Sequence, residues 1–163
     1  MSRLVVLTSI LLLACSASQP AVEREVIRAP GALEGLPFSS AVRVGDMLYL
    51  SGQIGNLPGT RELAAGGVAA ETRQALENIK GVLEYAGSGL DRVVKCTVFL
   101  ADMADYQAVN AVYQGYFPVD PPARSAVAGS GLALGARVEI ECLALVGAGT
   151  TRYPSAVPNE PEP

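Results

Sequence analysis

Arg92-Val93-Val94-Lys95-Cys96-Thr97-Val98-Phe99-Leu100 is the stretch that decides the fold. It is rich in β-branched residues, which favour a strand. Before it, apolar residues recur at helical spacing from Val68 to Ala86, and Gly87 is placed to end that helix. After it, Asp102 is the expected cap of a second helix, which Pro118 ends. The stretch therefore predicts a strand between two amphipathic helices.

Further strands are expected on both sides of this unit. Residues 41–44 and 47–54 predict a hairpin with Gly45 in its turn. A last strand is expected at residues 137–145, with a short one near Arg124. The order β-β-α-β-α-β predicts an α+β fold, a mixed sheet with two helices on one face. Because two helices cover only one side, the other face would be bare, which predicts self-association.

The start of the chain predicts export. Residues 1–14 combine a positive start with an apolar run that is too short for a comfortable membrane span, as in a signal peptide. Leu12-Leu13-Ala14-Cys15 resembles a bacterial lipobox, so we expect lipidation at Cys15 and a lipid anchor in the cell envelope or periplasm. Soluble export and an uncleaved anchor are the alternatives.

Two further segments lie outside the expected domain, which spans residues 29–147. Residues 15–28 are polar and predict a tether between a lipid and the folded body. Residues 148–163 are rich in proline and lack apolar periodicity, so a disordered tail is expected there.

The composition excludes several kinds of chemistry. Since the chain has no histidine, Ser-His-Asp and Cys-His relays and histidine-ligated metals are excluded. The 3 cysteines form no C-x-x-C motif, so no metal site is expected. A formal net charge of -4 provides no basic patch, and no nucleic-acid partner is expected. Cys96 and Cys142 are expected to be buried, inert thiols, and their pairing depends on a distance that the sequence does not give.

The candidates for chemistry are few, and each has two interpretations. Arg124 follows a proline-stiffened stretch and is either a fork for a substrate carboxylate or a surface arginine paired with an acid. Glu139 and Glu141 alternate with apolar residues, so they share a sheet face that is either functional or merely solvated. Asn110, in the second helix, is either a ligand or an ordinary polar helix residue.

Four segments also carry a family resemblance, in order and in spacing, and cover nearly the whole expected domain. They are Tyr49-Leu50-Ser51-Gly52-Gln53-Ile54-Gly55, Val93-Val94-Lys95-Cys96-Thr97-Val98-Phe99-Leu100-Ala101-Asp102, Pro122-Ala123-Arg124-Ser125 and Val138-Glu139-Ile140-Glu141. From Leu36 to Val146 the chain resembles the Rid family, also called the RidA or YjgF family. The resemblance implies a chorismate-mutase-like homotrimer with clefts between subunits. It also implies a deaminase that hydrolyses enamines and imines of small 2-imino carboxylates, such as 2-aminoacrylate and 2-iminopropionate, to the 2-oxo acid and ammonia, with no metal or organic cofactor.

The resemblance also assigns roles to individual residues. Arg124 matches the family arginine that binds the substrate carboxylate, Glu139 the glutamate linked to water activation, and Gly52 a backbone contact in the cleft. Where the family commonly has a tyrosine, Phe38 supplies a wall without a hydroxyl. Where it often has a cysteine, two residues after the arginine, this chain has Ala126.

Two functions from different classes follow from these matches. The retained Arg124 and Glu139 favour a deaminase that acts outside the cytoplasm. The missing hydroxyl at Phe38 favours the alternative, a trimer at the cell envelope that binds small carboxylates or acts as a chaperone without turnover.

Overall fold

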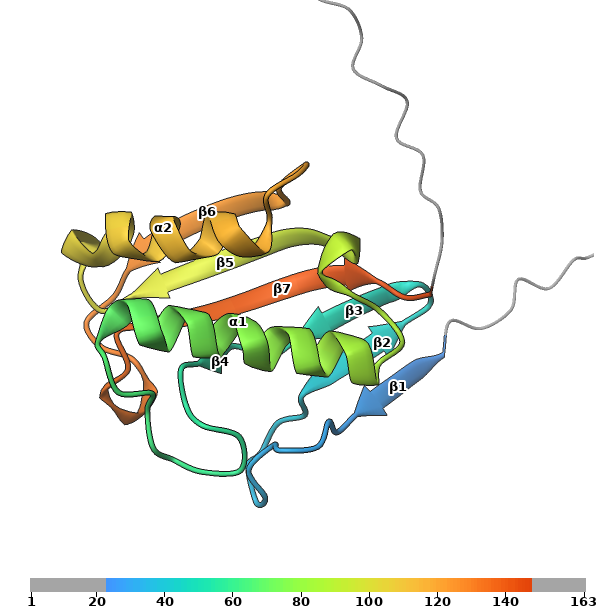
Figure 1. Ribbon diagram of the computed structural model, residues 1–163. Coiled ribbons are helices and arrows are strands. Elements are labelled where there is room, and N and C mark those ends of the chain that lie inside the picture. The colour runs from blue at the N-terminus through green and yellow to red at the C-terminus, as the bar shows by residue number, and fades with distance from the viewer. Residues whose placement is uncertain (1–22, 148–163) are drawn as a thin grey trace, which may run out of the picture.

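The strand that the opening stretch predicts lies inside a mixed sheet (Figure 1). The structure is a computed structural model that describes residues 23–147. Its strands follow the order β1-β2-β3-β7-β5-β6, with β4 paired to β7 off this path. The bounds are β1 Arg24–Ile27, β2 Ala41–Val44, β3 Met47–Leu50, β4 Gln53–Ile54, β5 Val93–Leu100, β6 Ala123–Ala128 and β7 Val138–Leu145. All pairs are antiparallel except β5 with β6, which is parallel.

Both helices cover the same face of this sheet, as Figure 1 shows. They are α1, Val68–Tyr85, and α2, Tyr106–Tyr116. Gly87 has a φ of 72°, a left-handed conformation that suits glycine, so α1 ends where the sequence predicts. The α+β architecture, a mixed sheet with two helices on one face, is confirmed.

The cap of the second helix differs in detail from the prediction. Asp102 accepts a hydrogen bond from the backbone N–H of Ala104 at 2.9 Å. This bond caps a short 3-10 turn, Met103–Asp105, and α2 begins only after that turn. The carboxylate of Asp102 therefore fixes the entry into α2 without capping the α-helix itself.

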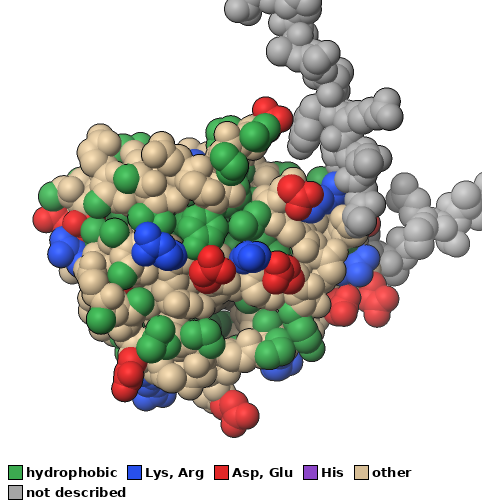
Figure 2. Space-filling model, viewed as in Figure 1, with side chains coloured by type: hydrophobic (Ala, Val, Ile, Leu, Met, Phe, Trp, Pro, Cys, Tyr) green, Lys and Arg blue, Asp and Glu red, His purple; other side chains and the backbone are tan. Residues whose placement is uncertain are grey.

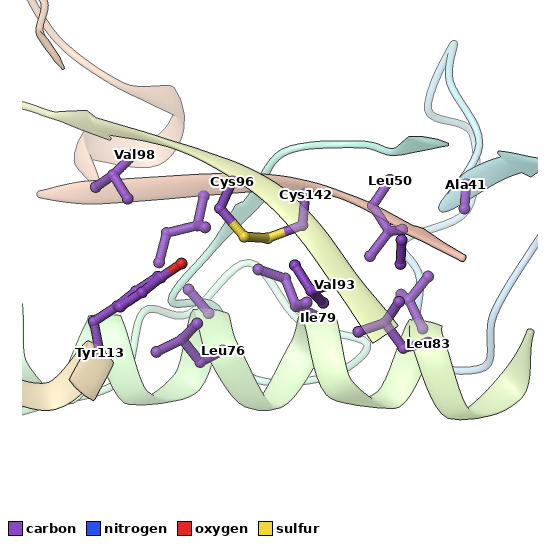
Figure 3. Packing of buried hydrophobic residues seen from close by; sticks show 14 of the residues in the cluster. Ala41, Leu50, Leu76, Ile79, Leu83, Val93, Cys96, Val98, Tyr113 and Cys142 are labelled. Atoms are coloured by element: carbon purple, nitrogen blue, oxygen red, sulfur yellow. A yellow bond between two sulfur atoms is a disulfide. The ribbon is translucent and has the colours of Figure 1, made fainter. Parts of the chain in front are cut away.

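The hydrophobic core lies between the sheet and α1 (Figure 3). Strands β5 and β7 are eight residues long and bury alternate side chains beneath the helices. The largest fully buried side chains are those of Leu48, Leu76, Ile79, Leu83, Leu100, Ile140, Val98, Val109, Val138, Thr72, Cys96 and Cys142. Burial of these side chains is the main favourable term that holds both helices against the sheet.

The two core cysteines are buried, as expected, and they form a disulfide, which answers the question of pairing that the sequence leaves open. Cys96 on β5 and Cys142 on β7 are direct register partners with a Cα–Cα distance of 4.1 Å. Both side chains are at most 1% exposed and point to the helix-covered side of the sheet. Figure 3 shows the disulfide between the strands and α1. The bond joins the two longest strands across the middle of the sheet.

The folded domain begins before residue 28, the predicted end of the tether. Residues 24–27 form β1, which pairs antiparallel with β2 from Arg24 opposite Val44 to Ile27 opposite Ala41. The sequence pattern does not indicate this edge strand, because its first three residues are exposed and two of them are charged. The folded body therefore starts before residue 29. The expected signal peptide, Cys15, the first part of the expected tether and the expected tail at residues 148–163 lie outside the described residues.

The expected hairpin strand at residues 47–54 is also divided. It ends as β3 at Leu50 and resumes as β4 at Gln53, and the two pieces pair with different parts of β7. Asn78 of α1 donates hydrogen bonds to the carbonyl oxygens of Ile54 at 3.2 Å and Asn56 at 3.0 Å. These bonds hold the segment after the break against α1. The break places Gly52 beside the start of β7.

The face of the sheet away from the helices has no covering layer within residues 23–147 (Figure 1). Its apolar side chains include Tyr49, which is 46% exposed, and Val127, which is 48% exposed. None of the helices in this part of the chain combines the length and apolar character needed to cross a membrane.

Candidate functional site

Arg124 projects from edge strand β6 toward α2. Its register partner on β5 is Cys96, whose side chain is buried under the helices, so the arginine lies on the helix-covered side of the sheet. Its Nη2 donates a hydrogen bond to Asn110 Oδ1 at 2.7 Å and another to the Tyr106 hydroxyl at 3.3 Å. Both partners belong to α2. The structure therefore brings two of the predicted site residues, Arg124 and Asn110, into direct contact.

An aromatic ring supports the same guanidinium. Cζ of Arg124 is 4.6 Å from the ring centroid of Tyr113, within the range of a cation–π interaction. Tyr113 is 5% exposed, and its ring packs against Phe117 with 4.7 Å between centroids. Burial raises the pKa of Tyr113 to about 12, against the opposing effect of Arg124. The platform under the arginine is therefore rigid and neutral.

The interpretation of Arg124 as a surface arginine paired with an acid is wrong. None of the salt bridges among residues 23–147 involves this guanidinium, whose hydrogen-bond partners are an amide and a phenol. Both of these bonds use Nη2, and the longer one, to Tyr106, is the one that a forking carboxylate can replace while Nε or Nη1 supplies its second donor. Because its partners are neutral, the positive charge of this guanidinium is available to bind an anionic ligand.

Glu139 lies on the opposite side of the sheet from the helices. Its neighbours on β7, Val138 and Ile140, are both 0% exposed beneath the helices, so Glu139 points the other way. Burial raises the pKa of Glu139, and the nearby carboxylate of Glu141 raises it further. The carboxyl group can thus hold a proton closer to neutral pH than an ordinary glutamate.

Gly52 lies directly against Glu139. A Cβ atom built on Gly52 would collide with the Glu139 carboxylate. Only glycine leaves room at this position for the carboxylate to lie beside the backbone between β3 and β4. The structure therefore brings together a second pair of predicted site residues, Gly52 with Glu139.

The expected single site is thus divided between two faces of the subunit. Arg124 with Asn110 lies on the helix-covered face, and Glu139 with Gly52 lies on the bare face. Phe38 precedes β2, is 58% exposed and belongs to neither pair by any described contact. Ala126 follows two residues after Arg124 on β6 and is half-buried.

Two tyrosines of the arginine cluster were missed from the sequence as site residues. Tyr106 and Tyr113 share a helix face with Asn110, at spacings of four and three residues. Aromatic residues in this pattern are typical of a core-facing helix side, so the spacing alone gives no reason to place them in a site. The signal that could have distinguished them is the polar Asn110 between them on the same face.

A second arginine was also missed. Arg137, just before β7, forms a two-pronged ion pair with Asp105, with Nη2 at 2.6 Å and Nε at 2.8 Å from the carboxylate oxygens. Its backbone N–H donates to Glu71 Oε2 at 2.8 Å. These bonds tie the start of β7, which leads to Glu139, to the starts of both helices.

The helix-covered face carries charges of both signs, interspersed without a continuous basic patch (Figure 2). Among residues 23–147, no three His, Cys, Asp or Glu side chains are grouped so that they could hold a metal ion. The described site offers guanidinium, phenol, amide and carboxyl groups.

The fold and this arginine cluster define a class of small α+β proteins with a chorismate-mutase-like sheet. The family model described as "Endoribonuclease L-PSP" matches residues 27–146. The chain belongs to this family, which is the Rid or YjgF family.

Curated relatives are similar over most of the chain. The human protein named "2-iminobutanoate/2-iminopropanoate deaminase" is 46% identical over 124 residues, which cover 76% of this chain and 89% of that one. The Arabidopsis thaliana protein "Reactive Intermediate Deaminase A, chloroplastic" is 39% identical over 132 residues, covering 79% and 70% of the two chains. Both names are those of enzymes.

Solved structures agree with the fold. The crystal structure of Escherichia coli TdcF with bound serine has a TM-score of 0.67 and 35% sequence identity to this chain. The match covers 74% of this chain and 98% of TdcF.

Proposed function

We propose that this protein hydrolyses reactive enamines and imines of small 2-imino carboxylates, such as 2-aminoacrylate and 2-iminopropionate, to the 2-oxo acid and ammonia. The observation that carries the proposal is the Arg124 guanidinium, which is held by neutral partners and has unused donors. The names of the human and Arabidopsis relatives support the same reaction.

The binding step needs a fixed cation that can fork onto a carboxylate. Arg124 meets this need because Asn110 and Tyr113 fix the plane of the guanidinium. Bidentate contact between Arg124 and the substrate carboxylate orients the neighbouring C2 carbon. This orientation raises the reaction rate, because the reacting groups are held close together. Serine, the ligand bound to TdcF, carries the same kind of carboxylate next to a nitrogen-bearing carbon.

The hydrolytic step needs a water molecule and a group that moves protons. The water oxygen bonds to C2 of the imine, and the C=N electron pair takes up a proton at nitrogen. The resulting carbinolamine then transfers its hydroxyl proton to nitrogen and forms the C=O bond as the C–N bond breaks and ammonia leaves. Glu139, whose raised pKa follows from burial and Glu141, accepts the proton from water and returns it to nitrogen.

We further propose that the chain acts as a homotrimer with its sites between subunits. Arg124 and Glu139 lie on opposite faces of one sheet, so a substrate needs the arginine of one copy and the glutamate of another. The bare sheet face, with Tyr49 exposed on it, is the surface available for such contacts.

We also propose that the protein is exported and held at the cell envelope by lipid at Cys15. The buried disulfide between Cys96 and Cys142 supports an oxidising compartment, where such bonds form and persist. Soluble export remains the alternative to lipidation. Either route places the deaminase outside the cytoplasm.

A coupled assay tests the function directly. Freshly generated 2-iminopropionate is supplied to the full chain, and ammonia release is measured against the spontaneous rate. Catalysed release that Arg124→Ala lowers about ten- to a hundredfold supports the deaminase. Tight pyruvate binding without any catalysed release would replace it with the non-catalytic carboxylate-binding function.

A further inference from the structure

The hydroxyl of Tyr106 has no role in the reaction described above, yet it touches the guanidinium that the reaction uses. It lies 3.3 Å from Nη2 of Arg124, and the Tyr106 ring centroid is 5.7 Å from Cζ. The Tyr106 side chain is only half-buried, so a ligand can reach this hydroxyl from solvent.

The two bonds at Nη2 are unequal. Asn110 Oδ1 accepts one N–H at 2.7 Å, whereas the Tyr106 oxygen accepts the other at 3.3 Å. A carboxylate that forks onto a guanidinium bonds one N–H of Nη2 together with one of Nη1 or Nε. The incoming carboxylate therefore takes the N–H that Tyr106 holds more loosely, and the displaced hydroxyl is left beside it.

The surroundings of Tyr106 make its hydroxyl a good donor to an anion. Before a ligand binds, hydrogen bonds with Asn110 and Arg124, and the charge of Arg124, lower the pKa of Tyr106; the Asn110 bond and the adjacent guanidinium remain when the carboxylate takes the Arg124 N–H. A phenol of lower pKa donates a stronger hydrogen bond to a carboxylate oxygen. The hydroxyl can rotate from accepting an arginine N–H to donating its own proton.

On the basis of the proposed function, we propose that Tyr106 is a further substrate-binding residue whose O–H donates a hydrogen bond to the carboxylate held by Arg124. The site then has a guanidinium fork and a phenol on one carboxylate. This arrangement favours substrates with a free carboxylate over their amides and esters, which offer one strong acceptor fewer.

The same helix offers a matched control. Tyr116 is also a tyrosine of α2, and its hydroxyl donates to Glu77 Oε1 at 2.6 Å, toward α1. Tyr116→Phe therefore removes one tyrosine hydroxyl from α2, with its contacts to Glu77 and to the carbonyl oxygen of Arg73, without touching Arg124. Tyr106→Phe removes a hydroxyl of the same kind beside the guanidinium.

The test measures pyruvate binding to the full chain by isothermal titration, together with kcat and KM for 2-iminopropionate. Tyr106→Phe should weaken pyruvate binding about tenfold and raise KM with little change in kcat. Tyr116→Phe should leave both within about twofold of the parent. Melting temperatures of the two variants confirm that both fold.

Each outcome separates this inference from the proposed function. Catalysed turnover in the parent, with equal pyruvate affinity in the parent and Tyr106→Phe, overturns the role of Tyr106 and leaves the deaminase intact. Tighter binding by Tyr106→Phe shows that the hydroxyl competes with the carboxylate and also overturns the role. A parent that neither binds pyruvate nor releases ammonia overturns both.

Discussion

Arg124 and Glu139 point to opposite faces of one sheet. Arg124 contacts Asn110 of α2 on the helix-covered face, while Glu139 lies against Gly52 on the bare face. Strand β5 separates the two strands that carry them. Under the proposed function, a small substrate that contacts both side chains would therefore need them from two copies of the chain.

The carboxylate fork predicts a large effect of Arg124→Ala. Loss of a charge-assisted bidentate contact should lower kcat/KM for 2-iminopropionate about ten- to a hundredfold. Arg124→Lys should restore little of this, because an ammonium cannot bond both oxygens in a plane or stack in the same way on Tyr113. The coupled ammonia assay measures both variants. Parent-like kcat/KM in Arg124→Ala would show that this arginine binds no substrate.

Glu139→Gln should separate turnover from binding. The amide keeps the shape of the side chain but cannot accept a proton from water, so kcat should fall about a hundredfold. Pyruvate affinity should stay near that of the parent, since Arg124 carries the carboxylate contact. Titration calorimetry and the ammonia assay on the same preparation check this pair of results. Equal losses of affinity and turnover would instead make Glu139 a ligand.

The same substitution has a stability signature that depends on pH. Burial raises the pKa of Glu139 in the folded chain above its unfolded value, so its ionised form destabilises the fold. Glu139→Gln should therefore raise the melting temperature near neutral pH. The gain should shrink as the pH falls through the folded pKa and vanish below the unfolded one. A gain that is independent of pH would show that desolvation of this carboxylate is not its cause.

The fold was largely predictable because its central elements are long and periodic. The α1 pattern and the stop at Gly87 were sufficient for that helix, and the β5 stretch was recognisable from its composition. The edge strand β1 was not, because it is short, mostly exposed and held by pairing with β2. Pairing with a distant strand leaves no local sequence pattern.

The site was predictable only in its parts. Arg124 and Glu139 could each be identified as candidates from the sequence. That their side chains point to opposite faces of the sheet depends on strand order and register, which cannot be predicted from the alternation of residues within one strand. Tyr106 could not be recognised as a site residue, because an aromatic residue that contacts an arginine has the same sequence pattern as one that fills a core.

The disulfide should be measurable by thiol labelling. Protein taken from an oxidising compartment and denatured without reductant should show no alkylation of Cys96 or Cys142, and both should label after reduction. The bond closes a loop with a sequence separation of 46, so reduction should lower the free energy of unfolding by about 2–4 kcal/mol. Full labelling without reductant would mean that the pair stays reduced.

Lipidation can be tested at Cys15. Full-length protein expressed in a bacterium should partition with membranes, and Cys15→Ser should release it or leave the precursor uncleaved. Fractionation followed by mass spectrometry of the mature N-terminus distinguishes the outcomes. An unmodified Cys15 in a soluble mature chain would favour soluble export.

Mixing two inactive variants tests the shared site most directly. Arg124→Ala and Glu139→Gln are each assayed alone, then unfolded together and refolded as mixed oligomers, with light scattering to confirm trimers. If each cleft takes its arginine from one subunit and its glutamate from the next, every mixed trimer regains one intact cleft. Ammonia release should then recover to roughly a quarter of the parent rate. Mixed trimers no more active than the separate variants would show that Arg124 and Glu139 do not act together across a subunit boundary.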